Sequence, residues 1–364
     1  MLQGRASHPS SPYRLRHQVH SSCPGIWYSQ LPRQKSPIHP RTNNPQFLFS
    51  IRLPLLLFAW TVWFALIQWT TPGTLLRKAN LWAIVGIPGI WWVDLQVDGV
   101  RRGSLGKAPN SYIPSGGSIV AASSTSPIDI VYLATILDPI FTQSYPGTNL
   151  VKPLSLPQAL LSYFTPPALT PPSTGLLPLS ALTASNPTRI IAVLPEGTAS
   201  NGRSILSLTP SLLSASPKTK IYPISLRYTP ADIVTPIPGL FSALTFLWTL
   251  LSSPTHCIRT RIGAPVRNTY SPESTTASPP SKANLLRRNS YESNYFDTLQ
   301  QNSEDEERRS REAVDGLTEP ARRMLDVIAD ALARLGRVKR VSLGVREKGK
   351  FVEAWGKGAR ARRS

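Results

Sequence analysis

The chain has 364 residues, enough to bury a full hydrophobic core, so we expect one folded domain with appended segments. Its formal net charge of +20 indicates an anionic partner surface, and both nucleic acid and anionic lipid meet that description. The two cysteines, Cys23 and Cys257, do not have the spacing of a zinc site, and we expect no metal centre.

Residues 1–46 form a basic tail without acidic residues, since the first carboxylate of the chain belongs to Asp94. The segment is rich in Pro, Ser, Arg and His. An acid-poor, Arg- and Ser-rich N-terminus is typical of a transit peptide, but the prolines spaced along this one would break an amphipathic helix. We therefore expect a disordered tail.

Two apolar runs follow the tail. Residues 53–69 carry no charge and are just long enough to span or deeply enter a bilayer, whereas residues 81–93 are too short to cross one and contain Gly86, Pro88 and Gly89. We expect a membrane-embedded helical hairpin at 47–93 that enters and leaves on the cytosolic face. The alternative is a pair of buried helices in a soluble core. A membrane-length run also favours lipid over nucleic acid as the anionic partner.

Residues 94–100 alternate apolar and polar side chains, which predicts a first strand. The basic segment that follows, residues 101–107, is either a solvated turn or a contact with lipid phosphates. Residues 118–122 form a second apolar strand pattern. Ser126 and Pro127 then supply the chemistry of a helix N-terminus, and the helix carries Asp129 in its first turn.

A third apolar strand is predicted at 189–194, and it runs directly into a Pro-Glu-Gly-Thr turn at 195–198. Open α/β sheets place their sites in loops at the carboxyl ends of buried strands, with glycine where the backbone turns sharply. Glu196 and Thr198 are therefore expected to point into a cleft.

The turn and its strand, Leu-Pro-Glu-Gly-Thr at 194–198, resemble the Phe-Pro-Glu-Gly-Thr block of the glycerolipid acyltransferases. Residues 118–133 resemble the first block of that family, Asn-His-x-Ser-x-x-Asp. By position Asp129 matches the Asp and Ser126 the Ser, while Ser123 and Ser124 stand where Asn and His are expected. Residues 220–228 resemble the family's Val-x-Pro-Val strand, with Pro223 as the match, although an internal proline alone would favour an edge strand.

The resemblance is greatest to the fungal lysophosphatidate:oleoyl-CoA acyltransferases. It implies an α/β fold with a mixed sheet flanked by helices, work at the endoplasmic reticulum and lipid droplets, and acyl transfer from acyl-CoA to lysophosphatidate. Acyl-CoA is then a co-substrate, the partners are membrane lipid and a lysophospholipid acceptor, and no cofactor and no nucleic acid are expected.

The same resemblance assigns roles to individual residues. Glu196, Gly197 and Thr198 would hold the glycerophosphate of the acceptor, and Pro223 would shape the acyl-CoA side of the cleft. Arg203 is either a phosphate-binding residue or an ordinary surface residue. Ser124 and Asp129 are what the chain has at the positions of the catalytic pair.

The missing imidazole is the main departure from the family. The five histidines are at positions 8, 17, 20, 39 and 256, so none lies near the first block in sequence, and a serine hydroxyl is no general base near neutral pH. Three interpretations remain open. Binding both substrates together suffices, with Asp129 or a water taking the proton; the fold brings His256 to the site; or the chain is a catalytically inactive, membrane-bound relative that binds lipid or partner proteins.

The expected acyltransferase domain covers residues 94–266, and its last part contains an apolar stretch at 240–251 and a closing strand at 257–266. The apolar stretch is either interfacial or a buried core helix. Residues 267–316 are expected to be a disordered insert. The remainder, 317–364, is predicted to contain a helix that begins after Thr318 and ends at Gly336, one strand at 338–345 and a basic tail.

Overall fold

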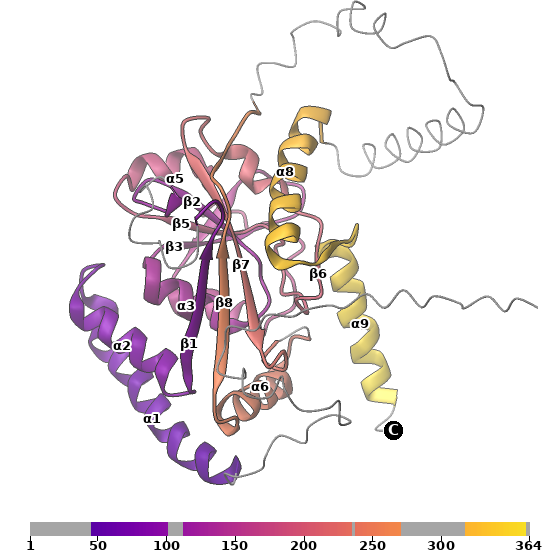
Figure 1. Cartoon of the computed structure of the whole chain (residues 1–364). Helices are drawn as coiled ribbons and strands as arrows, with labels where there is room; N and C mark the ends of the chain where they lie inside the picture. Colours follow the sequence, from indigo (N-terminus) through magenta and orange to yellow (C-terminus); the bar gives the residue numbers. More distant parts are fainter. Residues whose placement is uncertain (1–44, 101–111, 235–236, 271–316, 362–364) are drawn as a thin grey trace, which may run out of the picture. The chain divides into compact units, whose positions relative to one another are not determined.

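A computed structural model of the chain describes residues 45–100, 112–234, 237–270 and 317–361, with side chains to residue 356. The predicted basic tail up to residue 44, the basic loop at 101–107 and the predicted insert from residue 271 onward lie outside the described residues. The bounds proposed for the domains therefore stay predictions. What the structure does describe is a mixed α/β fold, as the sequence predicts (Figure 1).

An eight-stranded mixed sheet forms the centre of the described residues. Its main path has the strand order β1-β8-β7-β2-β5-β3-β4, and β9 pairs with β7. The strands are β1 (Ile90–Val97), β2 (Ile119–Ala122), β3 (Ile140–Ser144), β4 (Val151–Leu154), β5 (Ile191–Leu194), β7 (Lys220–Thr229), β8 (His256–Ile262) and β9 (Val266–Arg267). Because β2, β3, β5 and β7 run parallel to one another, their carboxyl ends meet at the same edge of the sheet.

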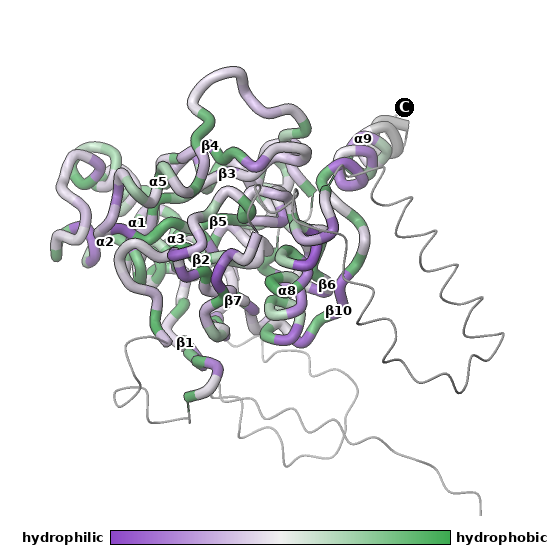
Figure 2. Tube along the Cα trace, turned by 90° about the horizontal axis from the view of Figure 1, so that it is seen from above, coloured by the Kyte–Doolittle hydropathy of each residue, from purple (hydrophilic) through white to green (hydrophobic). Residues whose placement is uncertain are grey.

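Helices cover both faces of this sheet. On one side lie α1 (Pro45–Ala65), α2 (Leu75–Gly86), α3 (Pro127–Leu137), α4 (Leu156–Leu161) and α6 (Leu240–Ser252). On the other lie α5 (Leu179–Ser185), the 3-10 helix η5 (Pro210–Ser214) and α8 (Glu319–Gly336). Figure 2 shows α1, α2 and α3 on one side of the central strands and α8 on the other.

The central strand β2 shows why both faces must be covered. Val120 and Ala122 belong to the core beneath α3, whereas Ile119 and Ala121 belong to the core beneath α8. All four side chains are fully buried, so the strand reads as a continuous apolar run rather than an alternating one.

Pro223 lies in a central strand, and the expectation of an edge strand at 220–228 is wrong. β7 pairs with β2 on one side, while on the other side Lys220 and Ile221 pair with β9 and the residues from Ile224 onward pair with β8. The proline lies where β7 changes its partner from β9 to β8, a position at which no backbone N–H is needed for a hydrogen bond between strands. Its carbonyl still accepts a hydrogen bond from the Gly263 N–H at 2.8 Å.

The first strand begins earlier than predicted, and the second apolar run is divided between two elements. α2 ends at Gly86, and β1 starts at Ile90 rather than at residue 94 and ends at Val97. The turn between them needs Gly89, whose φ is +89° and whose missing Cβ would otherwise lie 2.6 Å from the Pro254 carbonyl oxygen. Residues 90–93 therefore pair with β8 instead of entering a bilayer as part of a hairpin.

The segment Pro45–Trp69, which contains α1 and the short 3-10 helix η2 (Ile67–Trp69), is long and apolar enough to cross a membrane. Only Leu56, Ala59 and Trp63 of α1 are buried. Large apolar side chains are exposed on the three neighbouring helices: Phe47, Ile51, Leu55, Leu57, Phe58 and Phe64 of α1, Leu75, Leu76 and Trp82 of α2, and Leu240, Phe241, Leu244 and Trp248 of α6. Water would be a poor solvent for so much apolar surface.

Arg52 fastens α1 to the end of α6. Its guanidinium donates hydrogen bonds to the carbonyls of Leu251, Ser253 and Pro254 at 3.2, 2.5 and 2.9 Å, and to Pro88 at 3.3 Å. Phe49 adds an aromatic contact with Trp248, with 4.7 Å between ring centroids. The one charge of α1 is thus used to satisfy carbonyls at a helix C-terminus, where a cation is favoured.

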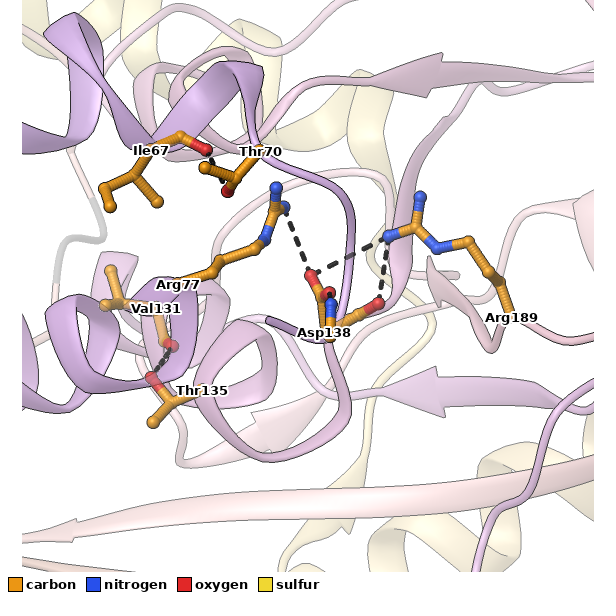
Figure 3. Close-up of polar contacts among 8 residues, drawn as sticks. Ile67, Thr70, Arg77, Val131, Thr135, Asp138 and Arg189 are labelled. Carbon is orange, nitrogen blue, oxygen red and sulfur yellow. Dashed lines mark hydrogen bonds and ion pairs between the residues drawn. The ribbon is translucent and has the colours of Figure 1, made fainter. Parts of the chain in front are cut away.

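A second polar junction lies at the other end of the sheet (Figure 3). Asp138, which ends α3 with a φ of 43°, forms ion pairs with Arg77 of α2 at 3.2 Å and with Arg189 at 3.7 Å. Arg189 also donates to the Asp138 carbonyl at 3.0 Å. Arg189 precedes β5, so it lies at the end of the strand opposite the Glu-Gly-Thr turn and takes part in fastening α2 and α3.

The C-terminal part differs from the predicted strand and tail. The predicted helix is confirmed as α8, although its cap is Arg337, with a φ of 50°, one residue beyond Gly336. Only β10 (Lys339–Arg340) is a strand, and it pairs with β6 (Ser204–Ile205). Val345 begins a second helix, α9 (Val345–Ala361), which was not predicted: the sequence favoured a strand at 338–345 followed by a basic tail.

Replacing Arg52 by Met is expected to release the end of α6, because a methionine fills the volume but leaves the carbonyls without donors. A lost charged hydrogen bond is worth about 1.5–3 kcal/mol, so hydrogen exchange of the amides at 249–253 should accelerate about tenfold or more. Exchange mass spectrometry on protein in detergent measures this. Arg52→Lys, which keeps the charge, should show a smaller change, and unchanged exchange in Arg52→Met would contradict the assignment.

Candidate active site

Two loops that follow β2 and β5 meet at the carboxyl edge of the sheet. The Ser124 N–H donates to Glu196 Oε1 at 3.1 Å, and the Ser200 N–H donates to the Ser124 carbonyl at 2.7 Å. The other Glu196 oxygen accepts from the Leu206 N–H at 3.2 Å. The completely buried Glu196 carboxylate thus joins the two loops through their backbones.

The turn around Gly197 requires glycine. Its φ is +65°, a region that other residues rarely adopt, and an added Cβ would lie 3.0 Å from Val345 Cγ2 and 3.2 Å from Thr209 Cγ2. Thr209 in turn fastens the loop, since its hydroxyl and its N–H both donate to the Pro195 carbonyl, at 2.9 and 2.7 Å. The first residue of α9 therefore packs directly against the loop.

Asp129 lies at the start of α3, fully buried beneath the first loop. Its Oδ2 accepts from the N–H groups of Thr125 and Ser126 at 2.7 and 2.8 Å, and from the Thr125 hydroxyl at 3.1 Å. Its Oδ1 accepts from the Tyr228 hydroxyl of β7. Ser126 is the N-cap residue, as expected from the sequence, and the structure adds that Ser126 and Asp129 form a capping box.

Burial dominates the proton affinities of both carboxyl groups. It raises the pKa of Asp129 to about 6, although the hydrogen bonds from Tyr228, Ser126 and Thr125 act in the opposite direction. It raises the pKa of Glu196 to about 8, against the bonds from the Ser124 and Leu206 backbones, and the nearby Asp129 charge raises it further. Two coupled acids thus share one water-poor region.

Ser124 occupies the boundary between this region and a pocket. Its hydroxyl donates to the Tyr163 hydroxyl at 3.0 Å, and Tyr163 comes from the segment just after α4. Both side chains line a hollow with about 490 Å³ of empty space, part of it open to solvent. The other lining residues are Phe141, Thr142, Gln143, Ser144, Leu154, Ala159, Ser162, Pro166, Pro167, Leu194, Gly197, Thr198 and Ala199.

The structure separates the expected site residues into three groups. Ser124, Gly197 and Thr198 line the pocket. Asp129, Ser126 and Glu196 are buried behind it, with their polar atoms engaged by the chain itself. The third group is away from the pocket wall: Arg203, whose N–H is held by Asn201 near β6, and Pro223 in the middle of β7.

His256 lies elsewhere. Its Nε2 is 2.9 Å from the Leu250 carbonyl at the end of α6, and burial lowers its pKa. The charges that act on it belong to Asp232 and Arg52, whereas the hydrogen bonds to Asp129 come from Thr125, Ser126 and Tyr228. The interpretation in which the fold brings His256 to Asp129 is therefore wrong.

Tyr163 and Tyr228 were not predicted as site residues. Tyr228 ends the strand pattern at 220–228, so the sequence predicts its place in a strand. Its hydrogen bond with Asp129, 99 positions away, could not be predicted from the sequence. Tyr163 follows a short helix in a Pro- and Leu-rich region without a recognisable motif. Among the described residues, no group of three or more His, Cys, Asp or Glu side chains is placed to hold a metal ion.

Comparison with known proteins finds one informative relative, and no family model matches the chain. The relative is a Schizosaccharomyces pombe protein named "Putative lysophosphatidic acid:oleoyl-CoA acyltransferase", 29% identical over 149 residues. The match covers 41% of this chain and 49% of the relative, so it spans about half of that protein's length. It supports a lysophosphatidate acyltransferase-like relationship, in agreement with the resemblance of the sequence blocks.

The buried acids make stability fall as the pH rises. A carboxyl whose pKa is higher in the folded chain than in the unfolded one binds its proton more tightly when folded, so folding is favoured at low pH. For Glu196 this stabilisation is present below its unfolded value of about 4.3 and is lost as the pH rises towards about 8. Thermal unfolding of the detergent-solubilised protein should therefore occur at lower temperature at pH 8 than at pH 5.

Glu196→Gln should reduce this difference, because an amide does not titrate. Glu319→Gln changes a partly exposed carboxylate in the first turn of α8 that pairs with the exposed Arg323, away from the site. It is the control and should leave the difference unchanged. An equal dependence on pH in wild type and Glu196→Gln would show that Glu196 does not carry the raised pKa.

Proposed function

From its acyltransferase-like relationship, we propose that the protein is a membrane-bound 1-acylglycerol-3-phosphate O-acyltransferase. It would move an acyl chain from acyl-CoA to lysophosphatidate in phospholipid and triacylglycerol synthesis, with Ser124 at the position of the usual histidine. The observation that carries the proposal is the hydrogen bond from the Ser124 N–H to the Glu196 carboxylate. It joins the two segments that resemble the acyltransferase blocks, 118–133 and 194–198, beside one pocket.

Individual residues take the following roles in this proposal. Gly197 and Thr198 line the pocket and would contact the glycerophosphate of the acceptor. Glu196 would hold the loops of the site in place by accepting hydrogen bonds from the N–H groups of Ser124 and Leu206. Arg203 would approach the acceptor phosphate only after a change of the loop after β5, and Pro223 would shape the site through β7. Acyl-CoA is the co-substrate, and no cofactor or metal is assigned.

The exposed apolar side chains of α1, α2 and α6 support a place on a membrane, where amphipathic lysophospholipid acceptors are found. We propose the endoplasmic reticulum membrane, and also the lipid droplet, with the active site facing the cytosol. Membrane lipid, acyl-CoA and a lysophospholipid acceptor are the proposed partners. Nucleic acid is not among them, since the positive charge of the chain is matched by an anionic leaflet.

A catalytically inactive relative is the second candidate, and a specific observation favours it. Asp129, the surviving member of the catalytic pair, is fully buried, and its carboxylate is already occupied by Thr125, Ser126 and Tyr228. On this view the retained blocks preserve a fold that binds lipid or a partner protein.

A radiolabelled oleoyl-CoA assay with purified protein in detergent micelles tests the proposal. The acceptors are lysophosphatidate and a panel of other lysophospholipids. Wild type should form labelled phosphatidate. Glu196→Ala should lower the rate at least about 100-fold, because the two loops lose their common anchor and the reacting groups their alignment. The surface variant Glu319→Ala, checked like the others by its thermal unfolding, should keep wild-type activity. A folded wild type without product from any acceptor would favour the inactive relative.

Membrane attachment should depend on apolar contacts. After cell lysis, the protein should remain in the membrane pellet through washes with 1 M salt and enter the supernatant in detergent, because salt screens charge but leaves burial of apolar side chains intact. Immunoblotting of both fractions measures this. Release by salt alone would instead favour an electrostatically bound protein, including one that binds nucleic acid.

A further inference from the structure

The outer strands of the sheet carry arginines on the face that α8 leaves uncovered. Figure 1 shows α8 beside β7, with β8 and then β1 further from it. The core beneath α8 contains no described residue of β1 or β8. In β8, Ile258 and Ile262 belong to the core on the other face of the sheet. Because side chains alternate along a strand, Arg259 and Arg261 point to the α8 side.

Arg227 of β7 lies beside the two arginines of β8. The two strands are antiparallel, and Arg227 is directly opposite Arg259, an arrangement in which like charges repel each other. Burial lowers the pKa of Arg261, and three neighbouring guanidinium groups lower it further, those of Arg337, Arg259 and Arg227. The Asp94 carboxylate of β1 acts in the opposite direction. We call Arg227, Arg259, Arg261 and Arg337 the arginine cluster.

Two members of the arginine cluster hold the end of α8. Nη1 of Arg227 donates to the Gly336 carbonyl at 2.8 Å, and Nη1 of Arg261 donates to the Leu335 carbonyl at 2.9 Å. Cations are favoured at a helix C-terminus, which accounts for these two contacts. Each contact uses one of the five N–H donors of a guanidinium group. Arg259 has no such role, and its buried Nε–H has no hydrogen-bond partner among the described residues.

The negative groups beside the arginine cluster are too few to neutralise it. Asp94 contributes one negative charge and also accepts a hydrogen bond from the Gln96 side chain at 3.1 Å. Asp98 is already paired with Arg334 at 2.7 Å. The C-terminus of α8 contributes about half an elementary negative charge. Four positive charges therefore face about one and a half negative ones, so an anion of more than one charge should be attracted to this face.

We propose that the arginine cluster is a binding site for phosphate groups. The planar fork of N–H donors on a guanidinium group matches the oxygens of a phosphate, and several arginines together match a ligand with more than one negative charge. Such a phosphate belongs either to a lipid headgroup or to the nucleotide end of a CoA molecule. None of the four arginines lines the pocket beside Ser124. The inference therefore goes beyond the proposed acyl transfer and does not require it.

Modification by phenylglyoxal, which reacts with accessible guanidinium groups, tests the site in the full-length protein. Peptide mass spectrometry measures the rate for each arginine. One probe is adenosine 3′,5′-bisphosphate, added to protein in neutral detergent. The other is phosphatidylglycerol, present in phosphatidylcholine nanodiscs that hold the protein. At saturation, at least one probe should slow the modification of Arg227 and Arg261 about tenfold or more, since a phosphate-bound guanidinium is shielded. The exposed Arg323, which pairs with Glu319 on α8, should keep its rate.

Arg259→Gln separates phosphate binding from the support of α8. The variant loses one charge but none of the hydrogen bonds to the helix carbonyls, so its thermal unfolding temperature should not fall. It should need a probe concentration about tenfold higher or more for half-protection of Arg227 and Arg261, because one charged contact is lost. Arg323→Gln removes the same charge elsewhere on α8 and should leave this concentration unchanged.

The two probes distinguish the sources of the phosphate. Protection by the nucleotide alone would assign the site to a CoA-type ligand, and protection by phosphatidylglycerol alone would assign it to the membrane surface. Protection by both would establish a site for phosphate groups of either source. Protection by neither probe, or protection that is unchanged in Arg259→Gln, would overturn the inference. Since no acyl-transfer rate enters these measurements, a failure here leaves the proposed function standing.

Discussion

The Glu196 carboxylate joins two loops that are 72 residues apart in the chain, and the arrangement of the pocket depends on this junction. One of its oxygens accepts from Ser124 after β2, and the other accepts from Leu206 beyond the turn after β5. A buried carboxylate without such donors would be costly, so the loops and the acid stabilise one another. The parallel arrangement of β2 and β5 supplies the geometry, because their carboxyl ends lie side by side.

The consequence for chemistry is a site built from acids and hydroxyls in place of an imidazole. Burial holds the pKa values of Asp129 and Glu196 above those of exposed carboxyl groups, the Tyr228 hydroxyl donates to Asp129, and the Tyr163 hydroxyl accepts from Ser124. An active enzyme and a folded but inactive relative would both have these contacts, so kinetic measurements are needed to separate them.

The sequence predicted the elements that carry local patterns. The strands at 119–122 and 191–194, the helix start at Ser126 and Pro127 and the amphipathic helix α8 follow from periodicity and helix-start chemistry. Contacts between segments that are distant in the sequence could not be predicted. Pro223 in a central strand depends on the change of partner from β9 to β8, and Tyr163 and Tyr228 reach the site through packing that no spacing encodes. Residues 90–93 were assigned to the apolar hairpin because aromatic and β-branched residues favour both a membrane interface and a strand.

The most direct test of the central claim is a structure of the protein with a non-transferable acyl-CoA analogue whose thioester sulfur is replaced by a methylene group. Our account predicts that the carbonyl carbon of the analogue lies in the pocket lined by Ser124, Gly197 and Thr198. The space between this carbon and Ser124 Oγ must hold the attacking hydroxyl, whose oxygen has to come within about 3–3.5 Å of the carbon. An analogue bound with its carbonyl outside this pocket, or loops at 123–129 and 194–198 that separate when it binds, would contradict the account.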